Sequence, residues 1–547
     1  MRTAHQETSP VFALCDQYIS GLAELDPVSA GIQGLSAAFG AATDYSPDGY
    51  AARAELITQT LARLGSLLVT DESERIAALY LRERLEAELG WHEAGEPLCQ
   101  VRTPFGLLSE LRGSVDMLPT HTEEDWRNIA ARLSALPAML DGWRASLEEG
   151  LRRGLAAARR QAIGQADQAA QYAFGRTHDP LTASYGSGPL ADVLASAAAT
   201  AYSAYSELAR YLRESYAPRA SSGPEGVGPQ RYMVNSRLTL GAELDLHEAY
   251  DWGWDELARI ESEIAAEANL VRTGASVAEA SAILDATEFV IGEDAYQAWL
   301  QERHDEAISR VSGVVFDIPE ELRRIEVVLM RGSASGAPYY SPPSEDLTRP
   351  GQTWWPLGGR TERFTTWNEL TAVFHEGVPG HHLQDGGTVV APALSRFART
   401  SLVSGHCEGW ALYAERLADE LGLFSAPGTR LGMLVASATR AARVVIDIGV
   451  HMDLPLPDGS RWSFAKACEV LRERGRIVEN RLVPEVTRYF GWPGQASSYK
   501  LGERAWFAAR ASASRKPYFD LKHWHTAALR LGPLGLGSLT EELARIY

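Results

Sequence analysis

Apolar residues recur at helical spacing through most of the first 325 residues. Segments rich in Ala, Leu, Glu and Arg repeat their apolar positions every 3 to 4 residues, which is typical of a helix with one buried face. The pattern predicts helices at 51–68, 73–90, 124–172, 188–214, 242–270, 276–291 and 294–311. A Pro-, Gly- and Ser-rich stretch between 216 and 231 is either a linker or a long connection.

The pattern changes near residue 325. Residues 325–330 (IEVVLM) predict a strand, and the Pro-, Gly- and aromatic-rich segment that follows it cannot form a helix. We expect the aromatic-rich segment to form a hairpin. This hairpin and the strand would border the functional site and pair with an extended substrate. Helical spacing then resumes at 366–376, 401–421, 431–452, 463–477 and 496–513. The fold prediction is therefore mainly α, with a helical half over 1–324 and a second half over 325–547 that together form one continuous unit.

Composition and charge exclude some classes of partner. The chain has 547 residues and a formal net charge of −19, which disfavours nucleic acid, and 45% hydrophobic residues supply a large core. It contains no run of 18 apolar residues and no apolar segment near its start that reads as a secretory signal, so we expect no membrane partner. The cysteines are scattered without a CxxC pair, which favours a reducing, cytoplasmic location; they are Cys15, Cys99, Cys407 and Cys468.

The candidate chemistry begins at the string VFHEGVPGHHLQ, residues 373–384. Thr366 and Glu369 have the spacing of a capping box for the helix that enters this string. The apolar face of that helix places His375 near a buried stripe. Two histidines four residues apart with a Glu after the first would bind one zinc ion from a single helix, but position 379 is a proline.

A straight helix cannot bring the histidines of this string together. His381 would lie ~9 Å along the axis from His375 and roughly 240° around it, and His382 ~10.5 Å along it. Neither can share an ion whose bonds to nitrogen are ~2 Å. The intervening glycines and proline can break the helix, so we predict a bend that returns one of the paired histidines to His375. The alternative is a helix end followed by a polar turn.

Glu408 is the candidate third ligand. It borders the apolar stripe of a predicted helix and has no basic residue three or four positions away. A carboxylate near a core needs a charge partner, and zinc is one. Gly405 and Gly409 would let another helix approach this one closely. A half-exposed Glu without a ligand role is the alternative.

The strings HEGVPGHHLQ and EGWALYAE resemble those of the bacterial DUF885 family. The likeness to this family includes three further strings and so spans roughly 335–540: YYSPPSEDLTRPG upstream, PGQASSYKLG downstream and LRLGPLGLGSL near the end. The family in turn resembles the helical gluzincin peptidases, in particular the M32 carboxypeptidases. That resemblance implies a large helical fold with a deep cleft, Zn²⁺, and short peptides as substrates.

The resemblance also implies roles for individual residues. His375, His381 and Glu408 would bind the metal, with His381 favoured over His382, and Glu376 would act as general base. Tyr499 is the first candidate for a donor to the developing oxyanion, because related peptidases use a downstream Tyr or His in this way. His525 and His451 are weaker candidates. A core tyrosine without a catalytic role is the alternative for Tyr499.

Four further charged residues have open roles. Arg443 and Asp447 lie four apart on an apolar helix, so we predict a part-buried salt bridge that is either structural or helps to orient ligands or substrate. Lys500 and Arg510 are candidates to anchor a peptide C-terminus, which would make the protein a carboxypeptidase.

Two other functions compete with peptide hydrolysis. The same zinc site would also serve a hydrolase of another amide or ester. An altered spacing of the histidines is also compatible with a degenerate site in a non-catalytic binding protein, although the retained Glu376 argues against this. The sequence leaves the oligomeric state open.

Overall fold

Helices form most of the chain in a computed structural model that describes residues 9–33, 40–220, 225–331, 336–344 and 347–546. The first eight residues, and residues 345–346 of the string YYSPPSEDLTRPG, lie outside the described residues. Up to residue 311 the helices are α2 (Pro10–Leu25), α3 (Pro27–Ile32), α4 (Pro47–Ser66), α5 (Glu72–Glu93), η1 (Glu96–Cys99), α6 (Leu107–Asp116), α7 (Glu123–Arg152), α8 (Arg159–Phe174), α9 (Asp179–Ser184), α10 (Ala191–Arg210), η2 (Tyr211–Tyr216), α11 (Pro229–Leu240), α12 (Leu246–Val271), α13 (Val277–Thr287) and α14 (Glu293–Val311).

The second part of the chain contains the strands and the remaining helices. Its helices are η3 (Glu320–Leu322), α15 (Leu370–Glu376), α16 (His381–Val390), α17 (Arg396–Thr400), α18 (Ser404–Glu420), α19 (Thr429–Met452), α20 (Phe464–Glu473), α21 (Glu479–Gly491), α22 (Ser498–Ala513), α23 (Leu521–Arg530) and α24 (Leu536–Leu543). The strands are β1 (Phe289–Ile291), β2 (Ile325–Met330), β3 (Tyr339–Ser341), β4 (Gly351–Pro356) and β5 (Arg363–Thr365). The predicted mainly α fold is confirmed.

Two predicted helices differ from the observed ones. The segment 124–172 forms two helices, α7 and α8, because the chain turns after Arg153 through Gly154, whose φ is 76°. The end of the segment 276–291 is extended, since Phe289–Ile291 leaves α13 and pairs with β5. In both places a tertiary contact or a single glycine overrides a helical composition.

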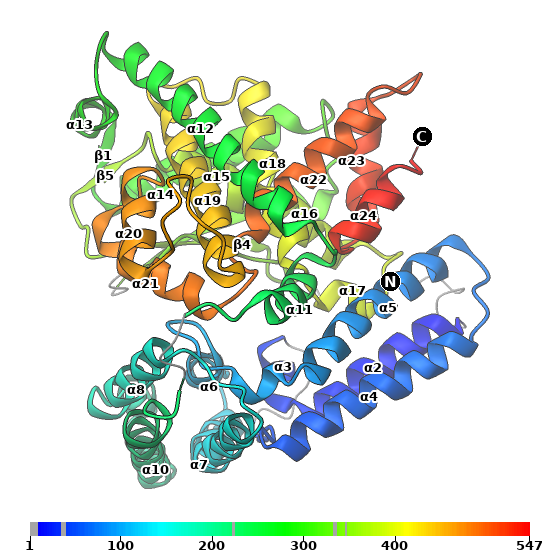
Figure 1. Cartoon of the computed structure of the whole chain (residues 1–547), viewed down its shortest axis with the longest axis vertical. Helices are drawn as coiled ribbons and strands as arrows, with labels where there is room; N and C mark the ends of the chain where they lie inside the picture. The colour runs from blue at the N-terminus through cyan, green and yellow to red at the C-terminus, as the bar shows by residue number, and fades with distance from the viewer. Residues whose placement is uncertain (1–8, 34–39, 221–224, 332–335, 345–346, 547) are drawn as a thin grey trace.

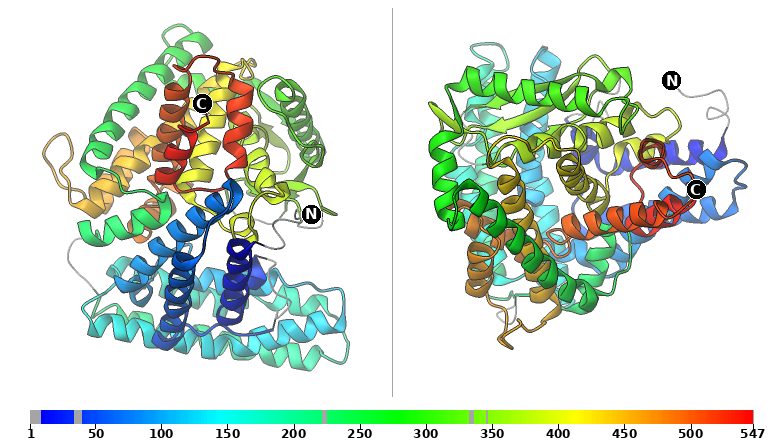
Figure 2. Two further views of the ribbon diagram at one scale, coloured as in Figure 1. Left: turned by 90° about the vertical axis from the view of Figure 1, so that its right-hand side faces the viewer. Right: turned by 90° about the horizontal axis from the view of Figure 1, so that it is seen from above.

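Two hydrophobic cores organise the helices. The smaller one joins α6, α7, α8 and α10, at the bottom of Figure 1, and includes Trp143 and Leu133. The larger one joins α2, α4 and α5 to the helices from α11 onward, and it includes residues on both sides of position 324. We call the helices around the smaller core the smaller lobe and those around the larger core the larger lobe. Figure 2 shows α2, α4 and α5 running between the smaller lobe and the remaining helices of the larger lobe. The larger lobe contains α15, α16 and α18.

The strands form two small sheets. β2 pairs in parallel with β4, and β3 pairs with β4 in the antiparallel sense, so Tyr339 lies opposite Trp354 and the two rings stack with centroids 5.9 Å apart. The predicted strand at 325–330 is therefore present, and the aromatic segment after it forms a hairpin. Tyr340 on β3 reaches the start of α16, which attaches this sheet to the candidate site.

Glycines allow α18 and α22 to pack with their backbones in contact. A Cβ atom on Gly409 would lie 2.5 Å from the Cα of Gly502, and one on Gly502 would lie 2.0 Å from the carbonyl oxygen of Gly405. No larger residue fits at such distances. The approach expected from Gly405 and Gly409 is thus confirmed, and it places the first turn of α22, with Tyr499, next to Glu408 on α18.

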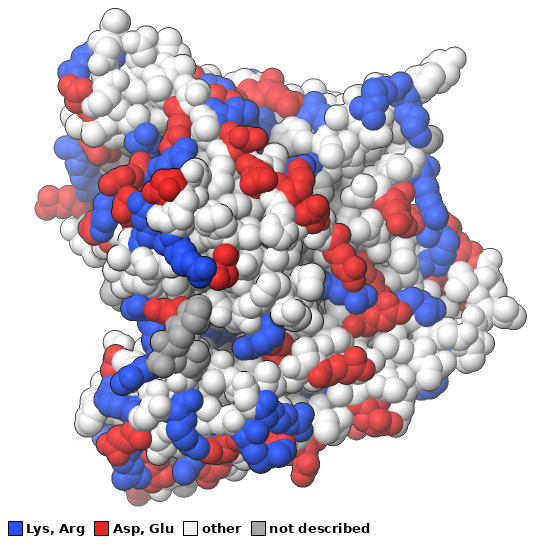
Figure 3. All heavy atoms as spheres, in the orientation of Figure 1, with Lys and Arg blue, Asp and Glu red and all other residues white. Residues whose placement is uncertain are grey.

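Acidic and basic side chains are interspersed on the face shown in Figure 3. Within the described part of the chain, no helix combines the length and the apolar character needed to cross a membrane.

Candidate metal centre

The helix that carries His375 ends abruptly after Glu376. α15 stops there, the chain turns through Gly377–Gly380, and α16 starts at His381. A Cβ atom at Gly380 would lie 2.0 Å from the carbonyl oxygen of His375, so only glycine allows this tight turn. The predicted break is therefore present. The predicted capping box is wrong: α15 begins at Leu370, and the Glu369 carboxylate instead accepts a hydrogen bond from Arg360 at 3.0 Å.

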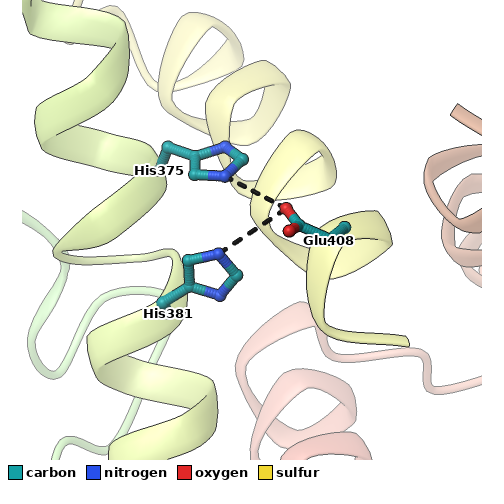
Figure 4. Close-up of side chains that lie close together, drawn as sticks. All are labelled: His375, His381 and Glu408. Atoms are coloured by element: carbon teal, nitrogen blue, oxygen red, sulfur yellow. Dashed lines mark ion pairs between the residues drawn. The ribbon is translucent and has the colours of Figure 1, made fainter. Parts of the chain in front are cut away.

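The turn brings two imidazoles to one carboxylate. The Nε2 atoms of His375 and His381 lie 3.3 and 3.7 Å from Oε2 of Glu408. Their candidate ligand atoms all fall within 4.8 Å of one another, and Figure 4 shows both rings pointing toward Glu408. The two rings are nearly perpendicular, with centroids 4.9 Å apart. Three side chains from three helices thus converge on one point.

His382, the other member of the pair, points elsewhere. Its Nδ1 lies 2.9 Å from the Tyr340 hydroxyl and its Nε2 lies 2.9 Å from the carbonyl oxygen of Leu322. Both ring nitrogens therefore have protein partners, and the side chain is fully buried. The structure separates the neighbours: His381 joins the cluster, and His382 fastens α16 to β3 and η3.

One further carboxylate is hydrogen-bonded to His375 and another lies near His381, and the sequence analysis assigns neither a role. Nδ1 of His375 lies 2.7 Å from Oε1 of Glu415, whose other oxygen accepts a hydrogen bond from the Thr371 hydroxyl at 2.7 Å. Nδ1 of His381 lies 3.4 Å from Asp385. The sequence spacing could have indicated both residues. Glu415 follows Glu408 by seven residues, which places the two on one face of a helix two turns apart, and Asp385 follows His381 by four. Such partners orient the imidazole of a metal ligand.

The surrounding charges shift the pKa values of the cluster. Burial opposes protonation of His375 and His381, but the nearby carboxylates outweigh it and raise both pKa values. Burial also opposes ionisation of Glu408, but the two imidazoles hold its pKa well below the ordinary value. The carboxylates around the two imidazoles therefore favour positive charge on the rings.

Glu376 lies beside the cluster and is buried. Burial raises the pKa of its carboxyl group, while the charges of His375 and His381 partly oppose this. A carboxylate with a raised pKa accepts and releases a proton more readily near neutral pH than an ordinary one. Glu376 is thus suited to proton transfer at the point where the three side chains meet.

The three converging residues fit a zinc ion. Oε2 of Glu408 is buried and makes no hydrogen bond of good geometry with the described residues, so an unsatisfied acceptor faces the two Nε2 atoms. Ligands of a tetrahedral zinc ion lie roughly 3.4 Å apart, close to the observed 3.3 and 3.7 Å. Two imidazoles and one carboxylate leave a coordination position open, as in catalytic rather than structural sites. Glu408 keeps 19% of its side-chain surface exposed, more than either histidine.

Tyr499 lies at the start of α22, close to this group. Burial and the charge of Glu408 raise its pKa to about 12, with Arg443 opposing. The Arg443 guanidinium sits 4.7 Å from the centre of the Tyr499 ring and fixes its position. The hydroxyl is therefore protonated at neutral pH and is available as a donor.

The structure does not bring His525 or His451 to the cluster. Nε2 of His525 lies 2.7 Å from the Tyr413 hydroxyl, its Nδ1 lies 3.2 Å from the Val315 carbonyl oxygen, and burial lowers its pKa to about 3. His451 is bonded through both nitrogens to backbone groups of Val227 and Tyr489. Both are core histidines with satisfied rings, so the role predicted for His525 is not supported by its position.

The predicted pair of Arg443 with Asp447 does not form. Arg443 reaches across to Glu485 on α21 at 3.0 Å, because a long side chain can leave its own helix. Asp447 instead accepts hydrogen bonds from the Tyr232 hydroxyl at 3.1 Å and from backbone amides.

The two proposed anchors for a peptide C-terminus are also occupied. Lys500 is fully buried, 2.9 Å from Glu256 and also paired with Glu503. Arg510 lies 2.8 Å from Glu420. The charge of each residue is therefore already paired with a carboxylate of the protein.

Fold and site together define a class: a large, mainly α-helical protein with a two-histidine, one-glutamate cluster at a helix break. The sequence pattern of a family described as bacterial proteins of unknown function, DUF885, matches residues 27–543. The chain belongs to this family. Among curated proteins, none matches it.

Two solved structures share the fold along nearly the whole chain. One, a candidate lipoprotein from Colwellia psychrerythraea, has a TM-score of 0.83 at 21% identity and covers 98% of both chains. The other, a candidate lipoprotein of unknown function from Shewanella oneidensis, has a TM-score of 0.76 at 16% identity and covers 97% of this chain and 99% of its own. At these identities the likeness shows the fold alone.

Proposed function

We propose that this protein is a zinc-dependent hydrolase of short peptides. One observation carries the proposal: the Nε2 atoms of His375 and His381 converge on an unsatisfied oxygen of Glu408, directly beside the buried Glu376. A buried carboxylate oxygen without a hydrogen bond is costly, and a shared cation removes that cost. The resemblance of the motifs to helical gluzincin peptidases supports the choice of zinc and of peptides.

The residues of the chain then have distinct tasks. When bound, zinc supplies Lewis acidity that lowers the pKa of water toward ~7 and polarises a substrate carbonyl. Glu376 takes the proton of the attacking water and passes it to the leaving amine. Tyr499 donates a hydrogen bond to the oxygen on which negative charge develops. Glu415 holds the His375 ring in place through its Nδ1 atom.

The test joins metal analysis with hydrolysis. The purified chain, loaded with zinc and freed of excess, should contain one ion per chain and should cleave members of a panel of N-acetylated dipeptides and tripeptides. A chelator should abolish the cleavage, and added zinc should restore it. Glu408→Ala should lose both the ion and the activity.

Other outcomes separate the competing functions. A chain that binds zinc and cleaves only esters or non-peptide amides would retain the hydrolase and overturn the peptide substrate. A chain that binds zinc at this site but hydrolyses nothing would support a binding protein. A chain that binds no zinc would overturn the whole proposal.

We also propose a cytoplasmic location. All four cysteines are buried and free of disulfides, which fits a reducing compartment. The lipoprotein names of the two similar structures apply to those proteins. Cell fractionation with antibody detection decides the point, because a membrane-bound or exported pool would overturn it. Beyond a short peptide, we propose no nucleic-acid or membrane partner.

A further inference from the structure

A small cavity, called here the α14 cavity, borders the helix that carries His375. It lies between α14, the start of α15 and the segment that joins α18 to α19, and α14 packs against α15. Its volume is about 150 Å³, and an apolar cavity of this volume holds a molecule the size of benzene. None of the three candidate metal ligands lines it, so the cavity is separate from the candidate metal centre.

Aromatic side chains form much of the wall of the α14 cavity. Trp299 on α14 is half-buried, and Trp367 and Phe374, before and on α15, are buried. The indole N–H of Trp367 already donates to Asp285 at 2.8 Å, so this residue offers an occupant ring surface and no free donor. The face of an aromatic ring carries negative potential and attracts a cation.

The charged residues of the cavity leave an excess of negative charge. Arg303, Glu288 and Glu306 line it, which gives the lining a net formal charge of −1. Nitrogens of the Arg303 guanidinium group lie 3.0 Å from Glu302 and 2.8 Å from Glu306, so its charge is already balanced. Glu288 is half-buried, and among the described residues no side chain pairs with its carboxylate. The cavity therefore has a carboxylate to offer and no unpaired cation.

The cavity opens to solvent at the segment between α18 and α19. Ser425 and Pro427 line it there and are exposed, whereas Leu370 and Phe374 line it on α15 and are buried. A molecule from solvent can therefore enter past this segment and come to rest against α15.

We propose that the α14 cavity binds a small methylated ammonium ion between its aromatic walls and Glu288. The methyl groups of such an ion pack against aromatic and aliphatic side chains, and a quaternary nitrogen has no N–H group that must be satisfied. Glu288 supplies the opposite charge, which a partly desolvated cation needs. This inference requires neither zinc nor hydrolysis, so it stands or falls separately from the proposed function.

Three probes separate the features of the ligand in titration calorimetry with the full chain. Choline carries the methylated cation, 3,3-dimethylbutan-1-ol has the same shape without the charge, and ethanolamine is a cation without the methyl groups. We expect choline to bind about 5 to 30 times more tightly than its neutral counterpart, as for a cation against aromatic rings. It should also bind more tightly than ethanolamine, whose ammonium group loses hydrogen bonds to water.

Two variants and two matched controls locate the site. Trp299→Leu removes a ring and Glu288→Gln removes the charge, and each should reduce the advantage of choline over its neutral counterpart about 5-fold or more. Trp91→Leu changes a half-buried tryptophan on α5, and Glu362→Gln changes an exposed glutamate before β5. Neither of these residues lines the cavity, so both controls should leave the advantage unchanged.

Several results would overturn the proposal. They are equal binding of choline and its neutral counterpart, no binding of either, and an advantage of choline that survives both Trp299→Leu and Glu288→Gln. Tighter binding of ethanolamine would overturn the methylated class of ligand. If Trp299→Leu does not fold, Glu288→Gln still decides, because it changes only a half-buried carboxyl group and keeps the shape of the side chain.

Discussion

Two buried histidine–carboxylate groups in the larger lobe differ in how their polar atoms are used. Around His451 and Asp447, on α19, both imidazole nitrogens are bonded to backbone groups, and Asp447 accepts three hydrogen bonds from Tyr232 and from two backbone amides. Around His375 and His381, an oxygen of Glu408 has no hydrogen bond of its own, and two ring nitrogens point at it.

The difference teaches how a site can be told from a structural network. The network around His451 and Asp447 satisfies these buried donors and acceptors, and each unsatisfied group would cost about 1–3 kcal/mol. A binding site keeps unsatisfied atoms aimed at one point and uses an outer partner, here Glu415 on His375, to hold them there. Residue type alone does not distinguish the groups, since both contain histidine and a carboxylate.

The largest effect should follow from Glu376→Gln. The amide cannot accept a proton, so the hydrolysis rate should fall on the order of 10²–10⁴-fold while the zinc content stays at one ion per chain. Steady-state hydrolysis and metal analysis of the same preparation measure both. A variant with unchanged turnover would show that another group is the base.

The neighbouring histidines offer the sharpest paired comparison. His381→Ala removes a nitrogen aimed at Glu408 and should abolish stoichiometric zinc binding. His382→Ala removes bonds to Tyr340 and Leu322, so it should keep the zinc and lower only the free energy of unfolding. Zinc titration with a fluorescent competitor measures the affinities. If His382→Ala loses the ion and His381→Ala keeps it, the assignment is reversed.

A smaller effect is expected at the outer partner Glu415. Glu415→Gln keeps the shape but weakens the hold on the Nδ1 atom of His375, so zinc should bind about 10 to 100 times more weakly. The same titration applies. An affinity equal to that of the parent chain would reduce Glu415 to a packing role.

The smallest effect on the metal should come from the structural network. Asp447→Asn places an amide group against backbone donors, so the free energy of unfolding should fall by about 1–3 kcal/mol with no change in zinc affinity. Urea denaturation and zinc titration together test this. Loss of zinc in a folded variant would mean that the two groups are coupled.

The sequence predicted the fold class and the break in the helix well, because both depend on local properties. Helical spacing extends over whole segments, and Gly377, Pro379 and Gly380 mark the break directly. The position of Glu408 near the histidines at that break was also predictable, since a carboxylate near the core without a basic neighbour needs a charge partner.

Other features depended on contacts between distant segments and could not be read from spacing. Arg443 forms an ion pair with Glu485 and not with Asp447, and Lys500 forms one with Glu256. Long side chains can reach partners on other helices, and only the tertiary fold brings those helices together. His525 has the residue type of a catalytic group, yet its place is decided by Tyr413 and Val315.

The most direct measurement is anomalous X-ray scattering at the zinc edge from crystals of the zinc-loaded chain. One strong peak should lie between Nε2 of His375, Nε2 of His381 and a carboxylate oxygen of Glu408. No peak at that point, or a peak held by His382 or by other residues, would contradict the account.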